Sequence, residues 1–155
     1  MAAPAAIAIR KATSADVATI VAMIADDALG AKREDASLPL RDEYRNAFAA
    51  IDADPNQFLA VVEQDGRIIG CMQLSFIPGL SRMGQWRGQI ESVRIASDIR
   101  GGGIGRQLIE WAIEKCRERG CGLVQLTTDK SRSDALRFYQ SLGFIASHEG
   151  LKLSL

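Results

Sequence analysis

Residues 100–105 read Arg100-Gly101-Gly102-Gly103-Ile104-Gly105, and they lie between a predicted strand at residues 89–95 and a predicted long helix at residues 103–119. Three consecutive glycines leave out three Cβ atoms where the backbone turns, so several N–H groups can point into one small volume. The positive end of the helix dipole attracts an anion to the same place. Arg100 and Arg106 flank the turn with full charges. The stretch therefore predicts a binding site for a diphosphate.

Two common phosphate-binding motifs do not fit this turn. In a G-x-G-x-x-G motif counted from Gly101 and Gly103, Arg106 occupies the position of the last glycine, and no acidic residue follows on a strand about 20 residues later. A P-loop needs Lys-Ser or Lys-Thr after its last glycine, and neither follows here. The turn alone leaves open the simpler interpretation that the glycines only permit a tight connection between strand and helix.

Two amphipathic helices are predicted in the first third of the chain, after a strand at residues 6–11. The first helix begins after Thr13-Ser14 and ends at Gly30. Its apolar face follows helical spacing and consists of Val17, Ile20, Val21, Ile24 and Ala28. The second helix opens at Pro39 and ends before Pro55. Its apolar face consists of Tyr44, Ala47, Phe48 and Ile51.

The central part of the chain is rich in strand signals. Residues 57–63 and 67–76 predict two antiparallel strands joined by a hairpin turn at Asp65-Gly66. Residues 76–88 predict a loop that carries an isolated Trp86. The helix at residues 103–119 turns one apolar stripe toward the sheet, formed by Ile104, Leu108, Trp111, Ala112 and Cys116.

The last third of the chain predicts one more helix and three strands. Residues 122–128 form an almost uninterrupted apolar run, which is typical of a central strand buried on both faces. A short helix at residues 134–142 ends at Gly143, and residues 144–146 and 151–155 predict closing strands. The order of elements favours an α/β protein with a mixed sheet and helices on both faces.

Composition limits the classes of function. A chain of 155 residues fits one domain, residues 1–155. The 19 basic and 19 acidic residues cancel, so no overall field would attract nucleic acid or a membrane surface. Three cysteines without paired spacing predict no metal site and a reducing, cytoplasmic location. Met1 to Ile9 is apolar but lacks a basic region, so we expect an irregular terminus leading into a strand and no cleaved signal peptide.

Two motifs in order resemble those of the GNAT superfamily of N-acetyltransferases. Residues 100–105 resemble its pyrophosphate-binding motif Q/R-x-x-G-x-G/A, with Arg100, Gly103 and Gly105 at the defining positions. Residues 135–144 resemble its A-x-x-F-Y-x-x-x-G-F signature and read Ala135-Leu136-Arg137-Phe138-Tyr139-Gln140-Ser141-Leu142-Gly143-Phe144. The resemblance implies the GNAT fold, a mostly antiparallel central sheet in which the fourth and fifth strands form a parallel pair, with helices on both faces.

The same resemblance implies that acetyl-CoA is the co-substrate and that its diphosphate lies at the glycine turn. The implied contacts in and around the turn are Arg100, Gly101, Gly102, Gly103, Ile104, Gly105 and Arg106. Backbone groups of the preceding strand, at Val93 and Ile95, would hold the pantetheine arm and the acyl carbonyl. The family often has asparagine three residues before the motif alanine, whereas this chain has Arg132, which could reach a phosphate instead.

The resemblance also directs attention to Tyr139 as the general acid. A phenol is protonated at neutral pH and can give its proton to a departing thiolate. The simpler interpretation is that Tyr139 only packs beside Phe138. Glu91 is the candidate base through a water molecule, because in a regular strand it would share a face with Val93 and Ile95. The alternative is that Glu91 pairs with an arginine such as Arg94.

One irregularity is expected in the strand at residues 89–95. Ile90 and Val93 have opposite parity, so one extra residue near Ser92 would bring both to the same face as a β-bulge. Trp86 and Arg87 could line the acceptor pocket, or Trp86 could seal the core or a dimer contact. Cys116 and Cys121 are expected to be packing residues, and His148 a surface residue.

These expectations together predict an acetyl-CoA-dependent N-acetyltransferase whose acceptor is a primary amine of a small molecule or peptide. The amine attacks directly, with no covalent enzyme intermediate and no metal. A non-catalytic acyl-CoA-binding module of the same fold is the alternative, and binding of another phosphorylated ligand at the turn is a further one. The interpretation leaves a homodimer open.

Overall fold

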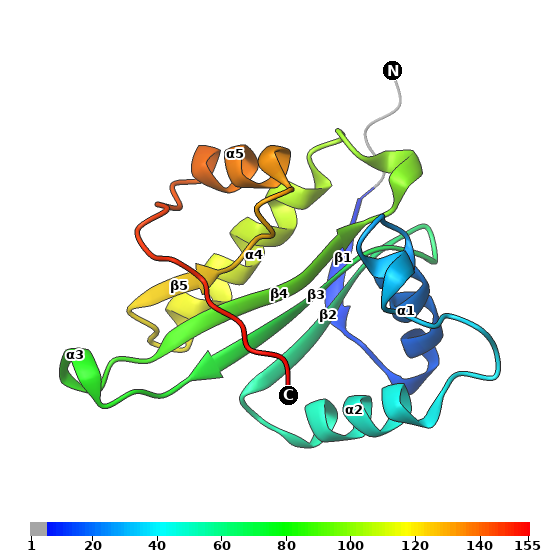
Figure 1. Ribbon diagram of the computed structural model, residues 1–155, viewed down its shortest axis with the longest axis horizontal. Coiled ribbons are helices and arrows are strands. Elements are labelled where there is room, and N and C mark those ends of the chain that lie inside the picture. The colour runs from blue at the N-terminus through cyan, green and yellow to red at the C-terminus, as the bar shows by residue number, and fades with distance from the viewer. Residues whose placement is uncertain (1–5) are drawn as a thin grey trace.

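A five-stranded mixed sheet forms the centre of the protein in the computed structural model, which describes residues 6–155 (Figure 1). The expectation for Met1 to Ala5 therefore lies outside the described residues. The strands lie in the order of the sequence, and all neighbours are antiparallel except the parallel pair β4 and β5. Their bounds are β1 Ala8–Lys11, β2 Gln57–Gln64, β3 Arg67–Ile77, β4 Arg87–Ile95 and β5 Leu123–Leu126.

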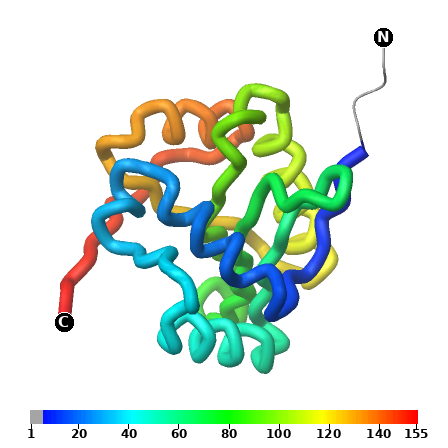
Figure 2. The backbone as a smooth tube through the Cα atoms, turned by 90° about the vertical axis from the view of Figure 1, so that its right-hand side faces the viewer, coloured from blue at the N-terminus to red at the C-terminus, as the bar shows by residue number. Residues whose placement is uncertain are grey.

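Helices cover both faces of the sheet (Figures 1 and 2). Helices α1 (Val17–Ala25) and α2 (Asp42–Ala53) pack on one face, and α4 (Ile104–Glu118) and α5 (Ser133–Ser141) on the other. A four-residue helix, α3 (Ser81–Gly84), and short 3-10 turns at Ser14–Asp16, Gly30–Lys32 and Ser97–Ile99 complete the elements. Within residues 6–155, no helix has the length and hydropathy needed to cross a bilayer.

Alternation along β2 shows how the two layers hold the sheet. Leu59 and Val61 face α1 and α2, whereas Ala60 and Val62 face α4, and all four are buried. Successive side chains of a strand point to opposite faces, so a strand covered on both faces is apolar throughout. The hairpin predicted at Asp65-Gly66 is confirmed, with φ of 51° and 76° at the two turn residues.

The first helix ends earlier than predicted. Helix α1 stops at Ala25, so Ala28 lies beyond it. The Asp27 carboxylate accepts the Gly30 N–H at 2.5 Å, which closes a separate turn after the helix. Gly30 has no left-handed φ; it is needed because a Cβ there would collide with the Ile24 carbonyl. Glycine is therefore required at position 30 because the backbone there passes close to the Ile24 carbonyl, and it does not terminate the helix.

The region predicted as one loop, residues 76–88, is partly ordered. Strand β3 continues to Ile77, α3 follows, and β4 already begins at Arg87. Trp86 is half-buried and packs against the core on the α4 side, and its carbonyl accepts the Gly122 N–H at 2.8 Å. Of the functions left open for Trp86, the structure supports packing against the core.

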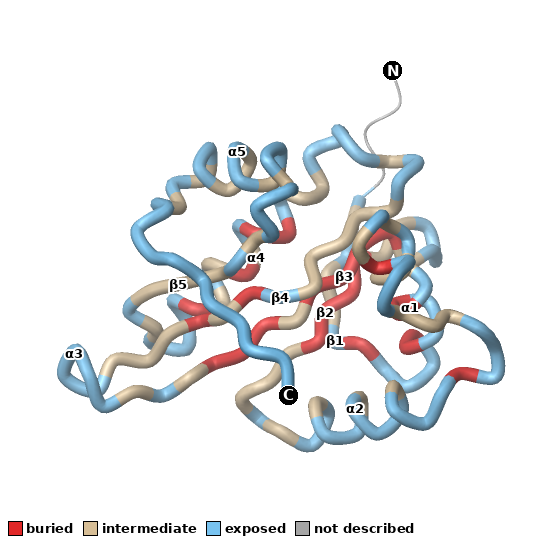
Figure 3. Tube along the Cα trace, in the orientation of Figure 1, coloured by how far each residue is buried: buried red, intermediate tan, exposed pale blue. Residues whose placement is uncertain are grey.

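The prediction that residues 122–128 form a central strand is wrong. Strand β5 pairs only with β4 among the described residues, so it is the last strand of the sheet, and its four residues are half-buried. The predicted closing strands at residues 144–146 and 151–155 are also absent from the structure. Phe144 packs on the core, but the chain beyond it is exposed (Figure 3). The outer edge of β5 therefore has no strand beside it among the described residues.

Candidate active site

The glycine turn connects β4 to α4 with two residues in the left-handed region. Gly101 has φ of 87° and Gly103 has φ of 80°, conformations that favour glycine, and Gly103 is the N-cap of α4. Gly102 lies between them without a left-handed φ. Residues 101–103 are exposed, and the N–H groups of the first helical turn have no partner inside a helix. The turn therefore presents backbone donors to solvent at the positive end of a 15-residue helix.

The bulge expected near Ser92 is confirmed. Cys71 pairs with Arg94 and Gln73 pairs with Glu91, so one residue of β3 opposes two residues of β4. Ser92 has φ of 55°, the left-handed conformation that a bulge can require. Val93 and Ile95 consequently pack against the same core as Ile90, on the α4 side of the sheet.

A gap opens between β4 and β5 beside this bulge. The parallel pairing runs from Arg87 opposite Leu123 to Ile90 opposite Leu126, where β5 ends. Strand β4 continues for five more residues, to Ile95, with no strand on that side among the described residues. Backbone groups along this free edge can bind an extended chain as a further strand would. Val93 and Ile95 lie on this edge, and the glycine turn follows directly.

Glu91 does not lie where the parity argument placed it. Its partner Gln73 faces α1 and α2, like Cys71, whereas Val93 and Ile95 face α4. The bulge changes the parity of the strand after Glu91, so the expectation of a shared face was wrong. Glu91 is exposed, and its expected alternative partner, Arg94, pairs with another carboxylate. A role for Glu91 as a base remains a prediction, from the opposite face of the strand.

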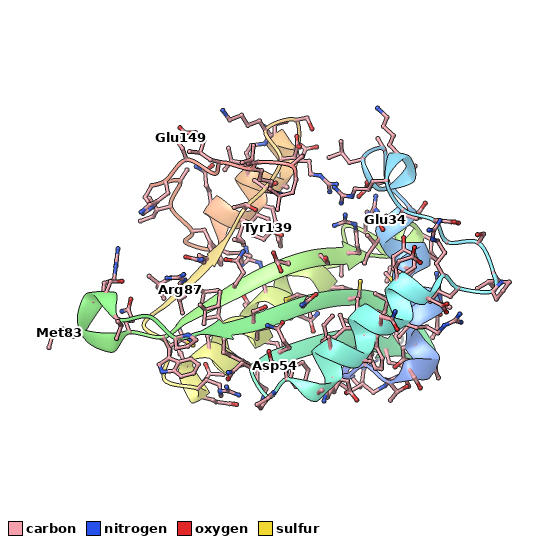
Figure 4. All side chains as sticks on the ribbon, turned by 60° about the horizontal axis from the view of Figure 1, so that its bottom comes forward. Glu34, Asp54, Met83, Arg87, Tyr139 and Glu149 are labelled. Atoms are coloured by element: carbon pink, nitrogen blue, oxygen red, sulfur yellow. The ribbon has the colours of Figure 1, made fainter. Side chains whose placement is uncertain are left out.

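Tyr139 lies on the side of α5 that faces the sheet (Figure 4). Its ring contacts Phe138 and Phe144 edge to face, with centroids 5.1 Å and 5.8 Å apart. Its hydroxyl forms no hydrogen bond with any described residue. Partial burial raises the pKa of Tyr139 above its ordinary value of about 10, and the positive charges of Arg94 and Arg132 offset only part of that rise. Tyr139 is thus protonated at neutral pH with its proton available to a ligand.

An ion-pair cluster that the sequence did not predict lies near Tyr139. Asp27, just after α1, forms an ion pair with Arg94 of β4 at 3.1 Å and accepts a hydrogen bond from Arg132 at the start of α5 at 3.0 Å. Burial alone would raise the pKa of Asp27, but the Gly30 N–H and the two guanidinium groups outweigh it and hold the pKa below its ordinary value. Two positive charges share one negative charge, so the Asp27–Arg94–Arg132 cluster carries a net charge of plus one.

No pattern in the sequence points to this cluster. Asp27 and Arg132 are 105 positions apart and belong to no common motif. Arg94 stands in a strand where alternation without a bulge would turn its side chain toward α4. Its side chain is only 11% exposed, and its Nε atom is buried without a hydrogen-bond partner in the described structure.

The three arginines predicted to contact the cofactor have different surroundings. The Arg100 Nε donates to the Ile95 carbonyl at 3.1 Å, which fixes this side chain at the end of β4. Arg106 is exposed and pairs with Glu110 one helical turn later, at 3.4 Å. Arg132 pairs with Asp27, so a phosphate would have to bind the Arg132 guanidinium beside the Asp27 carboxylate or displace that carboxylate from it. All three contacts with cofactor remain predictions.

The cysteines and the histidine have the surroundings expected of them. Burial raises the pKa of the Cys71 and Cys116 thiols to about 12, which leaves them protonated and poor nucleophiles at neutral pH. Burial also raises the pKa of Cys121. His148 is exposed, with Ser147 Oγ 2.7 Å from its Nδ1. Among residues 6–155, no three His, Cys, Asp or Glu side chains gather as a metal site would require.

Comparisons with known proteins agree with this geometry. Residues 21–144 match the model of the acetyltransferase (GNAT) family. The chain is 35% identical over 105 residues, 68% of each protein, to aminoalkylphosphonate N-acetyltransferase of Salmonella typhimurium. It is 37% identical over 90 residues to glucosamine 6-phosphate N-acetyltransferase of Trypanosoma brucei brucei, 58% of this chain and 59% of that protein.

A solved structure is more similar still. The crystal structure of a transcriptional regulator from Bacillus halodurans C-125 is 52% identical, with a TM-score of 0.94 over 97% of this chain and all of the other. The family match covers most of the chain, including both sequence motifs, and the named curated relatives above are N-acetyltransferases. The chain therefore belongs to the GNAT family of acetyltransferases.

Proposed function

We propose that the protein transfers the acetyl group of acetyl-CoA directly to the primary amine of a small molecule that also carries an anionic group. The diphosphate binds the backbone donors of residues 101–103. The pantetheine arm lies along the free edge of β4, where Val93 and Ile95 follow the bulge. This path brings the thioester to the end of the β4–β5 pairing, beside Tyr139.

The proposed reaction needs three proton transfers, the last of which restores Tyr139, and no covalent enzyme intermediate. The amine nitrogen attacks the thioester carbon, the C–S bond breaks, and the Tyr139 hydroxyl gives its proton to the departing sulfur. The nitrogen loses one proton, through water, to Glu91 or to solvent, and solvent returns a proton to Tyr139. A backbone N–H of β4 that holds the developing oxyanion in this partly buried place could lower the barrier by about 3 kcal/mol.

The state of Tyr139 is the observation that carries this proposal. The Tyr139 hydroxyl is not among the buried polar atoms that lack a hydrogen-bond partner, so it reaches solvent and is open to a ligand. It has no hydrogen-bond partner in the described chain, and its raised pKa keeps it protonated. This argues against the alternative of a non-catalytic acyl-CoA-binding module, because binding without acyl transfer requires no proton donor beside the thioester sulfur.

The anionic acceptor is inferred from the Asp27–Arg94–Arg132 cluster. Its surplus positive charge lies near Tyr139, and the buried Arg94 Nε still lacks an acceptor. The two relatives named above act, by their names, on an aminoalkylphosphonate and on glucosamine 6-phosphate, amines that bear a phosphonate or a phosphate. A phosphonate or phosphate on the acceptor would supply the missing negative charge.

A thiol-release assay with matched amines tests the acceptor class. We expect 2-aminoethylphosphonate to be acetylated with a kcat/KM at least tenfold higher than that of n-propylamine, which lacks the anion. Arg132→Gln is expected to reduce that preference, whereas Arg117→Gln, which removes an exposed charge that pairs with Glu114 in the last turns of α4, leaves it unchanged. Equal turnover of the two amines, or of a peptide with a free N-terminus, would contradict the anionic acceptor.

A further inference from the structure

Helix α5, which carries Tyr139, has a small apolar contact with the rest of the protein. None of its nine residues is fully buried, whereas α4 buries four of its residues. Phe138 and Tyr139 of α5, and Leu142 just after it, pack on the core while only partly buried. Packing of an apolar face supplies most of the stability of a helix in a protein. The position of α5, and with it that of the Tyr139 hydroxyl, therefore depends on further contacts.

One long-range hydrogen bond ties the start of α5 to the layer of α1. Arg132, the N-cap residue of α5, donates from Nη2 to Asp27 Oδ2 at 3.0 Å, across 105 positions of the chain. The other hydrogen bonds of residues 129–144 in the described structure join residues no more than five positions apart. Arg132 is therefore the polar link between α5 and the opposite side of the sheet.

The Asp27 carboxylate at the other end of this link is itself fixed. Its Oδ1 accepts the Gly30 N–H at 2.5 Å, which leaves Oδ2 to bind Arg132 and to pair with Arg94 of β4 at 3.1 Å. The backbone at Gly30 passes so close to the Ile24 carbonyl that a Cβ there would collide with it. Only 18% of the Asp27 side chain is exposed, so water and salt screen its charge weakly. Asp27 thus offers α5 a rigid anchor that also contacts the bulged end of β4.

Tyr139 lies close to this anchor but far enough along α5 to move with the helix. Burial raises the pKa of Tyr139, and the positive charges of Arg94 and Arg132 lower it, so both guanidinium groups are near the phenol. Seven residues separate Arg132 from Tyr139, about 10 Å along a helix axis. A tilt of about 6° about the start of α5 would move the ring by about 1 Å, and a misplacement of that size can slow a reaction about 100-fold.

We propose that Asp27 and Arg132 are positioning residues, which hold α5 so that the Tyr139 hydroxyl reaches the thioester sulfur. The inference rests on the proposed function, because it takes Tyr139 as the acid. Two other roles for the ion pair make different predictions. A role in stability alone leaves the kcat of the folded protein unchanged. A role in binding the acceptor's anion alone changes only the reaction of acceptors that carry one.

Kinetics with two amines separate these roles at saturating acetyl-CoA. We expect Arg132→Gln to lower kcat about tenfold for both 2-aminoethylphosphonate and n-propylamine, and to leave the KM of n-propylamine unchanged. This common factor cancels from the ratio of the two amines that reports the acceptor class. Arg132→Lys keeps the charge and is expected to recover most of the lost kcat. The matched control is Arg137→Gln on the same helix, whose exposed side chain pairs with Asp134 inside α5, and we expect it to keep the wild-type kcat.

A double-mutant cycle shows whether the effect passes through Tyr139. In a Tyr139→Phe background there is no acid left to position, so Arg132→Gln is expected to change kcat less than about twofold. Asp27→Asn is expected to give the same pattern. Hydrogen exchange provides a readout without activity: the amides of residues 133–141 are expected to exchange faster in Arg132→Gln than in wild type, with those of α4 unchanged.

The outcomes that overturn the positioning role differ from those that overturn the proposed function. An unchanged kcat in Arg132→Gln, a loss confined to 2-aminoethylphosphonate, or a full tenfold loss that persists in the Tyr139→Phe background would each overturn positioning. Because Arg132 is more exposed than Asp27, its variant decides the question if Asp27→Asn does not fold. An unchanged kcat in Tyr139→Phe itself would instead overturn the acid role in the proposed function.

Discussion

Replacing Gly103 with alanine tests whether the backbone of the glycine turn binds coenzyme A. Gly103 has φ of 80°, and nothing lies within 4 Å of the position that its Cβ would take. The added methyl group therefore meets no neighbour, and the change acts through the backbone conformation alone. Gly102→Ala is the matched control, because Gly102 has no left-handed φ and its Cβ would lie in ordinary contact, 3.5 Å from the Ile99 carbonyl.

The expected size of the effect follows from the left-handed conformation. An alanine held there costs roughly 1–2 kcal/mol. At about 2–4 °C per kcal/mol for a chain of this length, the melting temperature of Gly103→Ala falls by about 2–8 °C. If the turn rotates to relieve the strain, an N–H leaves the diphosphate. A hydrogen bond to a charged group contributes about 1.5–3 kcal/mol, so the Kd for CoA rises roughly 10- to 100-fold.

Calorimetric titration with CoA and thermal unfolding of the same samples measure both quantities. Gly103→Ala is expected to lose affinity and melting temperature, whereas Gly102→Ala keeps the affinity within about twofold. The reasoning is refuted if Gly103→Ala binds CoA as well as wild type despite its lower melting temperature. It is equally refuted if the Gly102→Ala variant loses as much affinity as Gly103→Ala, because the left-handed φ would then be irrelevant.

Two further substitutions test the chemistry and the ion-pair cluster. Tyr139→Phe keeps the ring contacts but removes the acid, so we expect kcat to fall about 100-fold with CoA affinity intact. Because burial raises the pKa of Tyr139, the alkaline loss of activity due to its ionisation is expected at a higher pH than for a free tyrosine, and it disappears in the variant. An unchanged kcat would remove Tyr139 from the reaction. Asp27→Asn leaves Arg94 and Arg132 without a carboxylate, and we expect about 3 kcal/mol lower stability in urea unfolding. The control is Asp98→Asn, whose partner Arg67 is exposed, with a change under about 1 kcal/mol.

Local patterns predicted the elements whose packing partners are near in sequence. The hairpin at Asp65-Gly66, the apolar stripe of α4 and the bulge at Ser92 all follow from spacing within a few residues. The glycine turn was predictable for the same reason, because its position between a strand and a helix is a local property. The family followed from two such local motifs read in order.

The predictions that failed depended on neighbours that are distant in sequence. An apolar run such as residues 122–128 is expected at the centre of a sheet, but β5 pairs with β4 alone among the described residues and is the last strand. The Asp27–Arg94–Arg132 cluster joins three segments whose contact no periodicity encodes. The early end of α1 depends on the Asp27 carboxylate that accepts the Gly30 N–H, which competes with the helix.

The bulge at Ser92 links the cofactor arm to the charge cluster. In a regular strand Val93 and Ile95 would face α1 and α2, and Arg94 would face the apolar core beneath α4, where an unpaired guanidinium is costly. One extra residue reverses all three orientations. It places Val93 and Ile95 over the core at the edge of β4 that β5 leaves free, and it turns Arg94 to Asp27. The left-handed conformation of Ser92 costs roughly 1–2 kcal/mol. In return, the bulge places the proposed cofactor edge and the positive cluster on opposite faces of the same three residues.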